Sequence, residues 1–154
     1  MYIYLVQHGE AKSEMEDPQR PLTKKGKQEV ESVAGYVASL EVEVAQIFHS
    51  GRLRAEQTAE LFAHYLSPTQ GLMVEKGLGP MDDPQEAKRL IDLVERPLMI
   101  VGHLPHLSRL TSLLILGTPE NEVVRFKMGG IVCLSENEKE WFVQWAFVPE
   151  LIHK

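Results

Sequence analysis

Residues 2–9 read YIYLVQHG, and this stretch indicates both the fold class and the position of a candidate site. The run from Tyr2 to Val6 is apolar on both faces, as a strand buried between helix layers should be. The run stops at Gln7, His8 and Gly9, where the glycine lets the backbone turn tightly or approach a ligand closely. Because α/β proteins bind small molecules beyond the carboxyl ends of their strands, His8 is a candidate catalytic group.

The rest of the chain alternates between strand-like and helical patterns. Further strands are expected at 45–48, 72–75, 98–101, 122–128, 130–135 and 141–147, and helices at 22–40, 50–66, 85–95 and 105–116. Thr23 is the expected N-cap of the first helix, and the glycine- and proline-rich stretch 77–84 is expected to be an irregular loop. This order predicts an α/β fold, a three-layer α/β/α sandwich with a mostly parallel sheet and antiparallel edge strands near the C-terminus. A length of 154 residues suits a single domain, residues 1–154, with one sizeable core.

Composition limits the classes of partner. Sixteen basic against 22 acidic residues give a net charge of −6, which argues against general nucleic-acid binding. The N-terminus shows no signal-peptide pattern, and the apolar runs are far shorter than the ~20 residues of a membrane span, so no membrane partner is expected. The only cysteine, Cys133, lies in an apolar run and is expected to be a core residue, which fits a cytoplasmic location.

Three of the predicted strands end in polar residues. His8 follows the first strand, Ser50 and Arg54 follow the second, and His103 follows the fourth. The strand ends of a parallel sheet lie along one edge, and two of these lead directly into helices, whose N-terminal amides attract anions. His8, Arg54 and His103 together therefore predict a phosphate site. The remaining histidines are expected to have structural or solvent roles: His49, His64, His106 and His153.

Four short stretches carry a resemblance to a known family. They are LVQHGEA (5–11), RPLT (20–23) with Gly26, the segment from Ser50 through LRAEQTA (53–59), and VGHLP (101–105). In this order they resemble the histidine phosphatase superfamily, also called the phosphoglycerate mutase-like family, and within it the small SixA-type phosphohistidine phosphatases. The resemblance covers about residues 1–148 and implies a three-layer α/β fold.

The resemblance also implies a mechanism. By motif match His8 is the nucleophile that forms a transient phosphohistidine, which water then hydrolyses, while Arg54 and His103 hold the phosphate. The resemblance implies an inorganic phosphate or similar anion in the site, and neither a metal nor an organic cofactor. The residue types suit this chemistry, because an imidazole with a pKa near ~6.5 is largely neutral and nucleophilic at pH 7. Arginine and protonated histidine can neutralise a transferring phosphoryl group without a metal.

The sequence departs from the family pattern at Gln7, where the family has an arginine. Glutamine keeps a hydrogen-bond donor but lacks a permanent charge, and losing one charge-assisted contact costs roughly 1.5–3 kcal/mol. We hypothesise that Arg52 or Arg20 supplies the missing charge, although a solvent-facing Arg52 is an equally good interpretation of the sequence. Gln7 itself and Ser50 complete the set of candidate phosphate-binding residues.

The substrate class depends on whether a general acid is present. A phosphate ester needs an acid to protonate its leaving oxygen, whereas a phosphoramidate such as phosphohistidine has a far better leaving group. Candidate acids are Glu10, Asp82 and Asp83, and the loop at 77–84 is too short to form a cap over the site. An open site favours a phosphohistidine phosphatase whose partner is a bulky phosphorylated protein.

Three alternatives remain open. The first is a phosphomonoesterase that acts on a small phosphorylated substrate and uses one of these acids. The second is a weakly active or non-catalytic module that binds phosphate or phosphohistidine, because Gln7 replaces arginine. The third is a metal hydrolase built on His8, His49 and His103, which has little support because the sequence contains no H-E-x-x-H motif.

Overall fold

The computed structural model describes residues 1–152 and contains six strands and five helices within them. In chain order these are β1 (Tyr2–Gln7), α1 (Lys24–Ser39), β2 (Gln46–His49), α2 (Leu53–Leu66), β3 (Leu72–Val74), α3 (Pro84–Leu93), β4 (Leu98–Gly102), α4 (His106–Leu116), β5 (Ile131–Asn137), β6 (Glu140–Phe147) and α5 (Pro149–Ile152). The predicted α/β class is confirmed. Thr23 is the N-cap of α1, since its side chain accepts a hydrogen bond from the Gly26 N–H.

All six strands belong to one sheet, in the order β3-β2-β4-β1-β5-β6. The first four strands in this order run parallel, and β5 and β6 continue the sheet as antiparallel strands. The strand order places β4 between β1 and β2, although β4 follows both of them in the sequence. As a consequence, the ends of β1, β4 and β2 lie side by side at one edge of the sheet.

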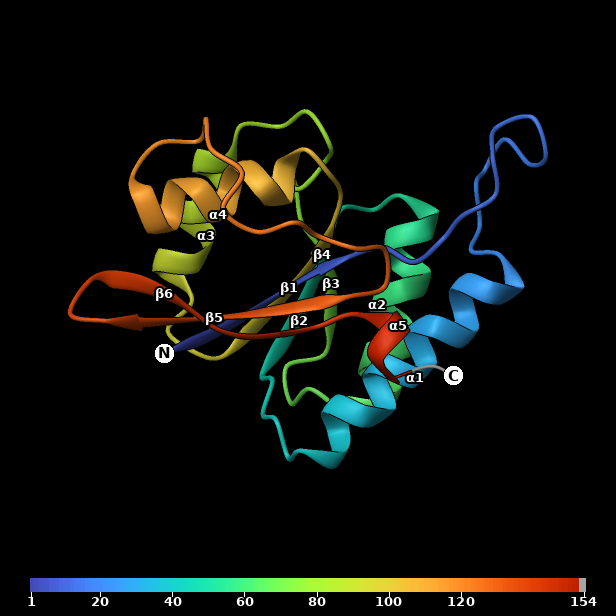
Figure 1. Cartoon of the computed structure of the whole chain (residues 1–154), viewed down its shortest axis with the longest axis horizontal. Coiled ribbons are helices and arrows are strands. Elements are labelled where there is room, and N and C mark those ends of the chain that lie inside the picture. Colours follow the sequence, from blue (N-terminus) through green and yellow to red (C-terminus); the bar gives the residue numbers. More distant parts are fainter. Residues whose placement is uncertain (153–154) are drawn as a thin grey trace.

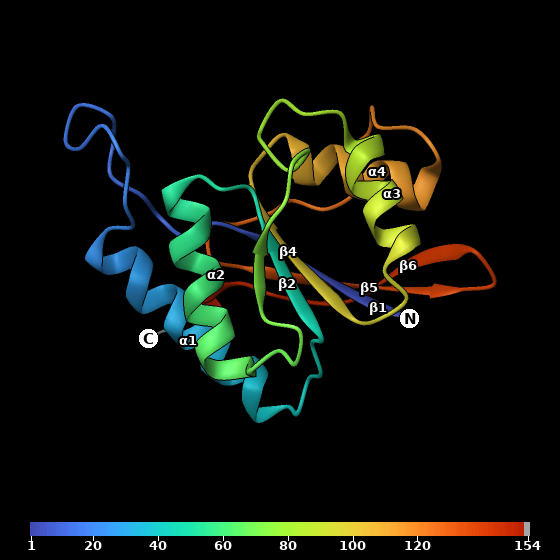
Figure 2. The same ribbon diagram turned by 180° about the vertical axis from the view of Figure 1, so that it is seen from behind.

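Helices cover both faces of the sheet, so the predicted three layers are confirmed (Figures 1 and 2). On one face α1 and α2 pack against the sheet through Val30, Val33, Val37, Ala59 and Phe62, all fully buried. On the other face α3 and α4 pack through Ala87, Ile91, Leu107 and Leu110, which are equally buried. These two apolar layers hold the sheet rigid and so fix the positions of the strand ends.

The segment between α4 and β5 differs from the prediction. A strand was expected at 122–128, but the structure has only an isolated bridge there, between Met128 and Gln7. Gly129 explains the difference, because its N–H donates to the carbonyl oxygens of Gln7 at 2.9 Å and His8 at 3.2 Å. The segment therefore crosses the end of β1 instead of pairing along a strand.

Two helix predictions also need correction. Helix α2 begins at Leu53, not at residue 50 or 51, because Gly51 has a φ of +90° and residues 50–52 form the turn after β2. The short helix α5 was not predicted, and its first residue is Pro149, which is buried. Within residues 1–152, no helix is both long enough and apolar enough to cross a membrane.

Candidate active site

The strand order brings the predicted site residues together at one edge of the sheet. The register of β1 and β4 pairs Gln7 with Gly102, so His8 and His103 follow their strands as neighbours. Ser50 follows β2 on the other side of β4. The rings of His8 and His103 lie 5.0 Å apart between centroids and are inclined by 53°. Two imidazoles and one hydroxyl from three strands therefore share a single site.

His8 is held in one orientation and one tautomer. Its Nδ1 lies 2.7 Å from the carbonyl oxygen of Gly9, and because a carbonyl can only accept, Nδ1 carries the proton and donates it. The other ring nitrogen, Nε2, keeps its lone pair. The pKa of His8 is lowered to about 4, mainly by burial and also by the charges of Arg54 and Arg20, against the opposing effect of the Gly9 hydrogen bond. At pH 7 the imidazole is therefore neutral and its Nε2 is nucleophilic.

His103 is buried to a similar degree and is also neutral. Its Nε2 and the hydroxyl of Ser50 are hydrogen-bonded at 2.6 Å. Burial lowers the pKa of His103 to about 3, and the nearby His8, Arg54 and Arg52 act in the same direction. Its Nδ1 is buried without a hydrogen-bond partner among the described residues. A bound anion would supply a partner for this ring and would favour its protonated form.

Arg54 lies in the first turn of α2, within electrostatic range of both His8 and His103. Burial lowers the pKa of Arg54, and the like charges of Arg20 and Arg52 lower it further. Its Nε is buried and finds no partner within residues 1–152. A half-buried guanidinium with a free Nε donor, in a positively charged surrounding, is suited to holding a phosphoryl oxygen.

Thr58 links Arg54 to the end of β1, and sequence reasoning assigned it no role. The fully buried hydroxyl accepts a hydrogen bond from the Gly9 N–H at 3.0 Å and donates one to the carbonyl oxygen of Arg54 at 2.8 Å. Thr58 follows Arg54 by four residues in the same helix, so the two lie on one helix face. This spacing was the signal that could have identified Thr58 from the sequence. Thr58 thus sets the distance between the His8 backbone and α2.

The additional phosphate-binding candidates differ in their burial and in their hydrogen-bond partners. Gln7 is half-buried, and its Oε1 has no partner among the described residues. The Nε of Arg20 donates to the carbonyl oxygen of Lys12 at 3.0 Å. The side chain of Arg52 lies against Gly79, in the loop that precedes α3. Both of these arginines lie within electrostatic range of Arg54.

The three candidate acids each have a structural partner. Glu10 accepts a hydrogen bond from the Thr23 hydroxyl at 3.0 Å, and its other oxygen lies 3.7 Å from Lys25 Nζ. Asp82 accepts from the Gly79 N–H at 2.7 Å. Asp83 caps α3 by accepting from the Gln85 N–H at 3.0 Å. These contacts orient the three carboxylates toward their own loops and helices.

The remaining histidines lie outside the pair at the strand ends. His49 Nδ1 accepts from the Gly51 N–H at 3.0 Å and so supports the turn after β2. His64 is exposed and packs edge-on against the neighbouring Tyr65. His106 is fully buried at the start of α4, and His153 lies outside the described residues. Among residues 1–152, no three or more His, Cys, Asp or Glu side chains are grouped so that they could hold a metal ion.

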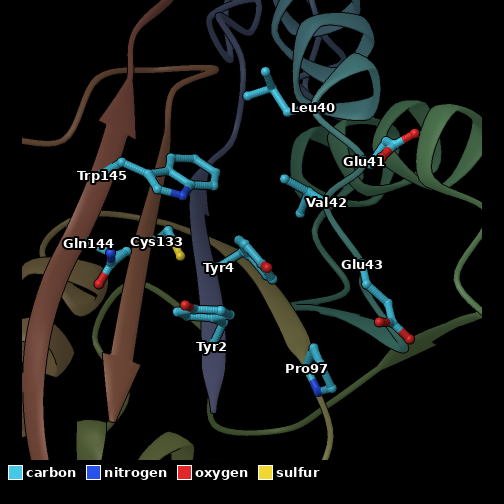
Figure 3. Close-up of a pocket in the computed structure, with 10 residues that line it drawn as sticks. All are labelled: Tyr2, Tyr4, Leu40, Glu41, Val42, Glu43, Pro97, Cys133, Gln144 and Trp145. Atoms are coloured by element: carbon cyan, nitrogen blue, oxygen red, sulfur yellow. The ribbon is translucent and has the colours of Figure 1, made fainter. Parts of the chain in front are cut away.

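A hollow in the surface lies away from His8, beside the N-terminal end of β1 (Figure 3). It has a volume of about 400 Å³ and is lined by the start of β1, by the segment after α1, and by Pro97, Cys133, Gln144 and Trp145. Two exposed carboxylates, Glu41 and Glu43, belong to its lining. Negative charge there disfavours a phosphate. This hollow is therefore a poor candidate for a phosphate site.

Solved structures of similar fold include several phosphatases. A structure of the protein histidine phosphatase SixA complexed with tungstate has a TM-score of 0.85 and 25% identity, over 98% of this chain and 99% of that one. An α-ribazole phosphatase from Shigella flexneri has a TM-score of 0.74 and 18% identity, over 94% of this chain and 95% of that one. A phosphoserine phosphatase mutant from Entamoeba histolytica, in complex with phosphoserine, has a TM-score of 0.70 and 15% identity, over 94% and 95%. The last two show the fold alone.

The sequence itself matches a family profile. Residues 3–82, more than half of the chain, match the histidine phosphatase superfamily (branch 1). No curated protein gives a significant match. The superfamily and the structural neighbours are phosphatases, which supports a hydrolase that acts on phosphate groups. The chain, with its paired histidines at the ends of β1 and β4, is thus a member of the histidine phosphatase superfamily.

Proposed function

We propose that this protein is a phosphohistidine phosphatase, which removes the phosphoryl group from a phosphorylated protein through a covalent intermediate on His8. The observation that carries the proposal is the hydrogen bond from His8 Nδ1 to the Gly9 carbonyl oxygen. This bond leaves Nε2 as the only ring nitrogen with a lone pair, and the lowered pKa keeps the ring neutral. A nucleophile is therefore ready without a separate base.

The reaction takes place in two displacements at phosphorus. In the first, the lone pair of His8 Nε2 forms a bond to phosphorus as the bond from phosphorus to the substrate nitrogen breaks, and the substrate imidazole, protonated on its other ring nitrogen, leaves as a neutral ring. In the second, a water oxygen attacks phosphorus, the bond to Nε2 breaks, and inorganic phosphate leaves with His8 restored to its neutral form. Arg54 and His103 are the groups proposed to hold the equatorial oxygens, where negative charge must be balanced throughout.

The substrate class follows from the three candidate acids. Glu10, Asp82 and Asp83 are each engaged in a local hydrogen bond. The charges that shift the pKa of His8 belong to arginines. Ester cleavage needs a placed proton donor for the leaving oxygen, whereas phosphoramidate cleavage depends on one far less. This favours phosphohistidine over a sugar or nucleotide phosphate.

The expected partner is a protein that carries phosphohistidine. The loop between β3 and α3 is short, and the site stands at the open edge of the sheet without an inserted cap. A bulky phosphorylated surface can therefore approach it. A cytoplasmic location stays a prediction, based on the single cysteine, which is buried in β5.

Phosphoenzyme trapping tests the proposal. The protein is mixed with a histidine phosphotransfer domain carrying labelled phosphohistidine and quenched in alkali, where phosphohistidine survives. The wild type should acquire label on a single histidine and release inorganic phosphate, while His8→Ala should do neither. His64→Ala is the matched control, because His64 is exposed near the far end of α2.

Two results would redirect the proposal. If sugar or nucleotide phosphates are hydrolysed faster than the phosphorylated domain, the protein is a phosphomonoesterase. If the domain binds but no label is transferred and no phosphate is released, the protein is a binding module.

A further inference from the structure

We propose that Arg52 is a second phosphate-binding guanidinium, which acts together with Arg54 and largely sets the affinity of the site for anions. This inference rests on the proposed function, because it assumes that the strand edge at His8 receives a phosphoryl group. Arg52 is exposed at the N-cap of α2, and this position alone does not suggest a role in anion binding.

The first argument is the charge balance of the site. A phosphoryl group carries roughly −1.5 to −2 charges at neutral pH. Before an anion binds, His8 and His103 are neutral at pH 7, since their pKa values are lowered to about 4 and about 3, and the adjacent Gln7 has no charge. Arg54 and Arg20 contribute the permanent charges that act on His8, and the Nε of Arg20 already donates to the Lys12 carbonyl oxygen. A further cation whose donors are all free would strengthen the binding of a dianion.

The second argument is the position of the Arg52 side chain. The chain turns at residues 50–52, so that the Arg52 N–H donates to the Ser50 hydroxyl at 3.3 Å, and the same hydroxyl is hydrogen-bonded to His103. From this turn the Arg52 guanidinium extends to Gly79, in the loop that precedes α3. An added Cβ at Gly79 would lie 2.8 Å from Arg52 Nη1 and 2.8 Å from Asp82 Oδ2.

The loop at Gly79 places an opposite charge near the Arg52 guanidinium. Arg52 Nη1 and Asp82 Oδ2 flank the same backbone position, so they lie within twice that 2.8 Å of each other, without forming a salt bridge. The Asp82 carboxylate is itself fixed by the Gly79 N–H at 2.7 Å. The Arg52 guanidinium therefore packs against this loop, and the absence of a side chain at Gly79 leaves space for the guanidinium.

The third argument is that the charge of Arg52 acts on the site and is not engaged elsewhere. It contributes to the lowered pKa values of both His103 and Arg54. Within residues 1–152 its guanidinium forms neither an ion pair nor a hydrogen bond, so all its donors remain available. Arg20, the other candidate, already donates its Nε to the Lys12 carbonyl oxygen. Arg20 acts on His8 and Arg54, whereas Arg52 acts on His103 and Arg54 and keeps all its donors free for an anion.

Direct binding of inorganic phosphate tests this role independently of catalysis. Isothermal titration should show that Arg52→Gln binds phosphate about tenfold more weakly or worse, as expected for the loss of a charge-assisted contact. Arg52→Lys should lie between the two, because a lysine keeps the charge but not the fork of donors. Arg96→Gln is the matched control, since Arg96 is exposed just before β4, at the opposite edge of the sheet.

A rescue experiment distinguishes phosphate binding from a structural role. In the Arg52→Gln background, Gln7→Arg places a guanidinium next to His8 and should restore phosphate affinity to within about threefold of the wild type. Circular dichroism and the melting temperature establish that each variant is folded. Loss of phosphate affinity in Arg52→Gln and its recovery with Gln7→Arg would support the proposal.

Other outcomes would overturn the inference. Phosphate affinity within twofold of wild type in Arg52→Gln would refute it, as would an equal loss in Arg96→Gln or a failed rescue by Gln7→Arg. A larger loss in Arg20→Gln than in Arg52→Gln would assign the role to Arg20. If phosphate binding behaves as expected but no phosphoenzyme forms, the proposed function fails while the role of Arg52 stands.

Discussion

Replacing Thr58 by valine should weaken both the fold and the site. The substitution keeps the shape of the side chain but removes the acceptor of the Gly9 N–H and the donor to the Arg54 carbonyl oxygen. The Gly9 N–H would then be buried and unpaired, which costs about 1–3 kcal/mol of unfolding free energy. For a chain of this size that corresponds to a fall in Tm of about 3–10 °C.

The effect of Thr58→Val on the reaction should exceed its effect on stability. Without the hydroxyl, the backbone that carries His8 can move relative to α2, which carries Arg54. A displacement of about 1 Å in such an arrangement costs on the order of 10²-fold in rate. We expect the rate of phosphoenzyme formation to fall about 10- to 100-fold in rapid-quench measurements, at temperatures where the variant is fully folded.

Thr58→Ser is the control for the Thr58 prediction. Serine keeps the hydroxyl and loses only the methyl group, so its rate of phosphoenzyme formation should stay within a few-fold of the wild type. If Thr58→Val is as stable and as fast as the wild type, the hydroxyl does not link the two segments. If serine loses as much rate as valine, packing of the methyl group and not hydrogen bonding is responsible.

The remaining predictions concern packing and pH. Gly26→Ala should lower the unfolding free energy by about 1–3 kcal/mol, because the added Cβ would lie 2.2 Å from the Glu10 carbonyl oxygen. Gly35→Ala in the same helix should raise the unfolding free energy by about 0.5–1 kcal/mol, since the nearest atom to its Cβ would be 3.5 Å away. Urea denaturation of both variants measures the two changes. Stability should fall as the pH drops from about 6.5 toward 4, because unfolded histidines bind protons there while His8 and His103, with pKa values lowered to about 4 and about 3, do not. His103→Gln should reduce this loss of unfolding free energy by roughly 3 kcal/mol over the interval, and an unchanged pH dependence in urea titrations would contradict it. Phosphoenzyme formation should lose rate only below about pH 5, since His8 must be neutral to attack, and an acid limb centred at the ordinary histidine value of 6.5 would show that His8 is not the group that limits the reaction.

The local features of the fold were predictable because they depend on neighbours in the sequence. The apolar run from Tyr2 to Val6 and the cap at Thr23 each follow from the properties of a few adjacent residues. The site residues were predictable for a related reason, because polar residues directly after buried strands collect at one edge of a parallel sheet. The proximity of His8 and His103 therefore followed from two local signals.

The rest depends on contacts between distant segments. Nothing near residues 122–128 indicates that Gly129 will bind the backbone at Gln7 and His8, so a strand-like composition there was misleading. The engagement of Asp82 by Gly79 and the position of Arg52 against the same glycine depend on where a loop after β3 lies relative to α2. The lowered pKa of His8 likewise requires the burial that only the assembled sheet and helices provide.

The hydrogen bond between His8 and Gly9 has a consequence for the chemical identity of the intermediate. If His8 is phosphorylated as proposed, its modified form is the 3-phosphohistidine isomer, since the 1-position is the Nδ1 atom that donates to the Gly9 carbonyl oxygen. Antibodies selective for one isomer would distinguish the two. The acceptor belongs to the main chain, so no side-chain substitution at position 9 deletes it. The choice of isomer should thus persist even in variants whose rate has been greatly reduced.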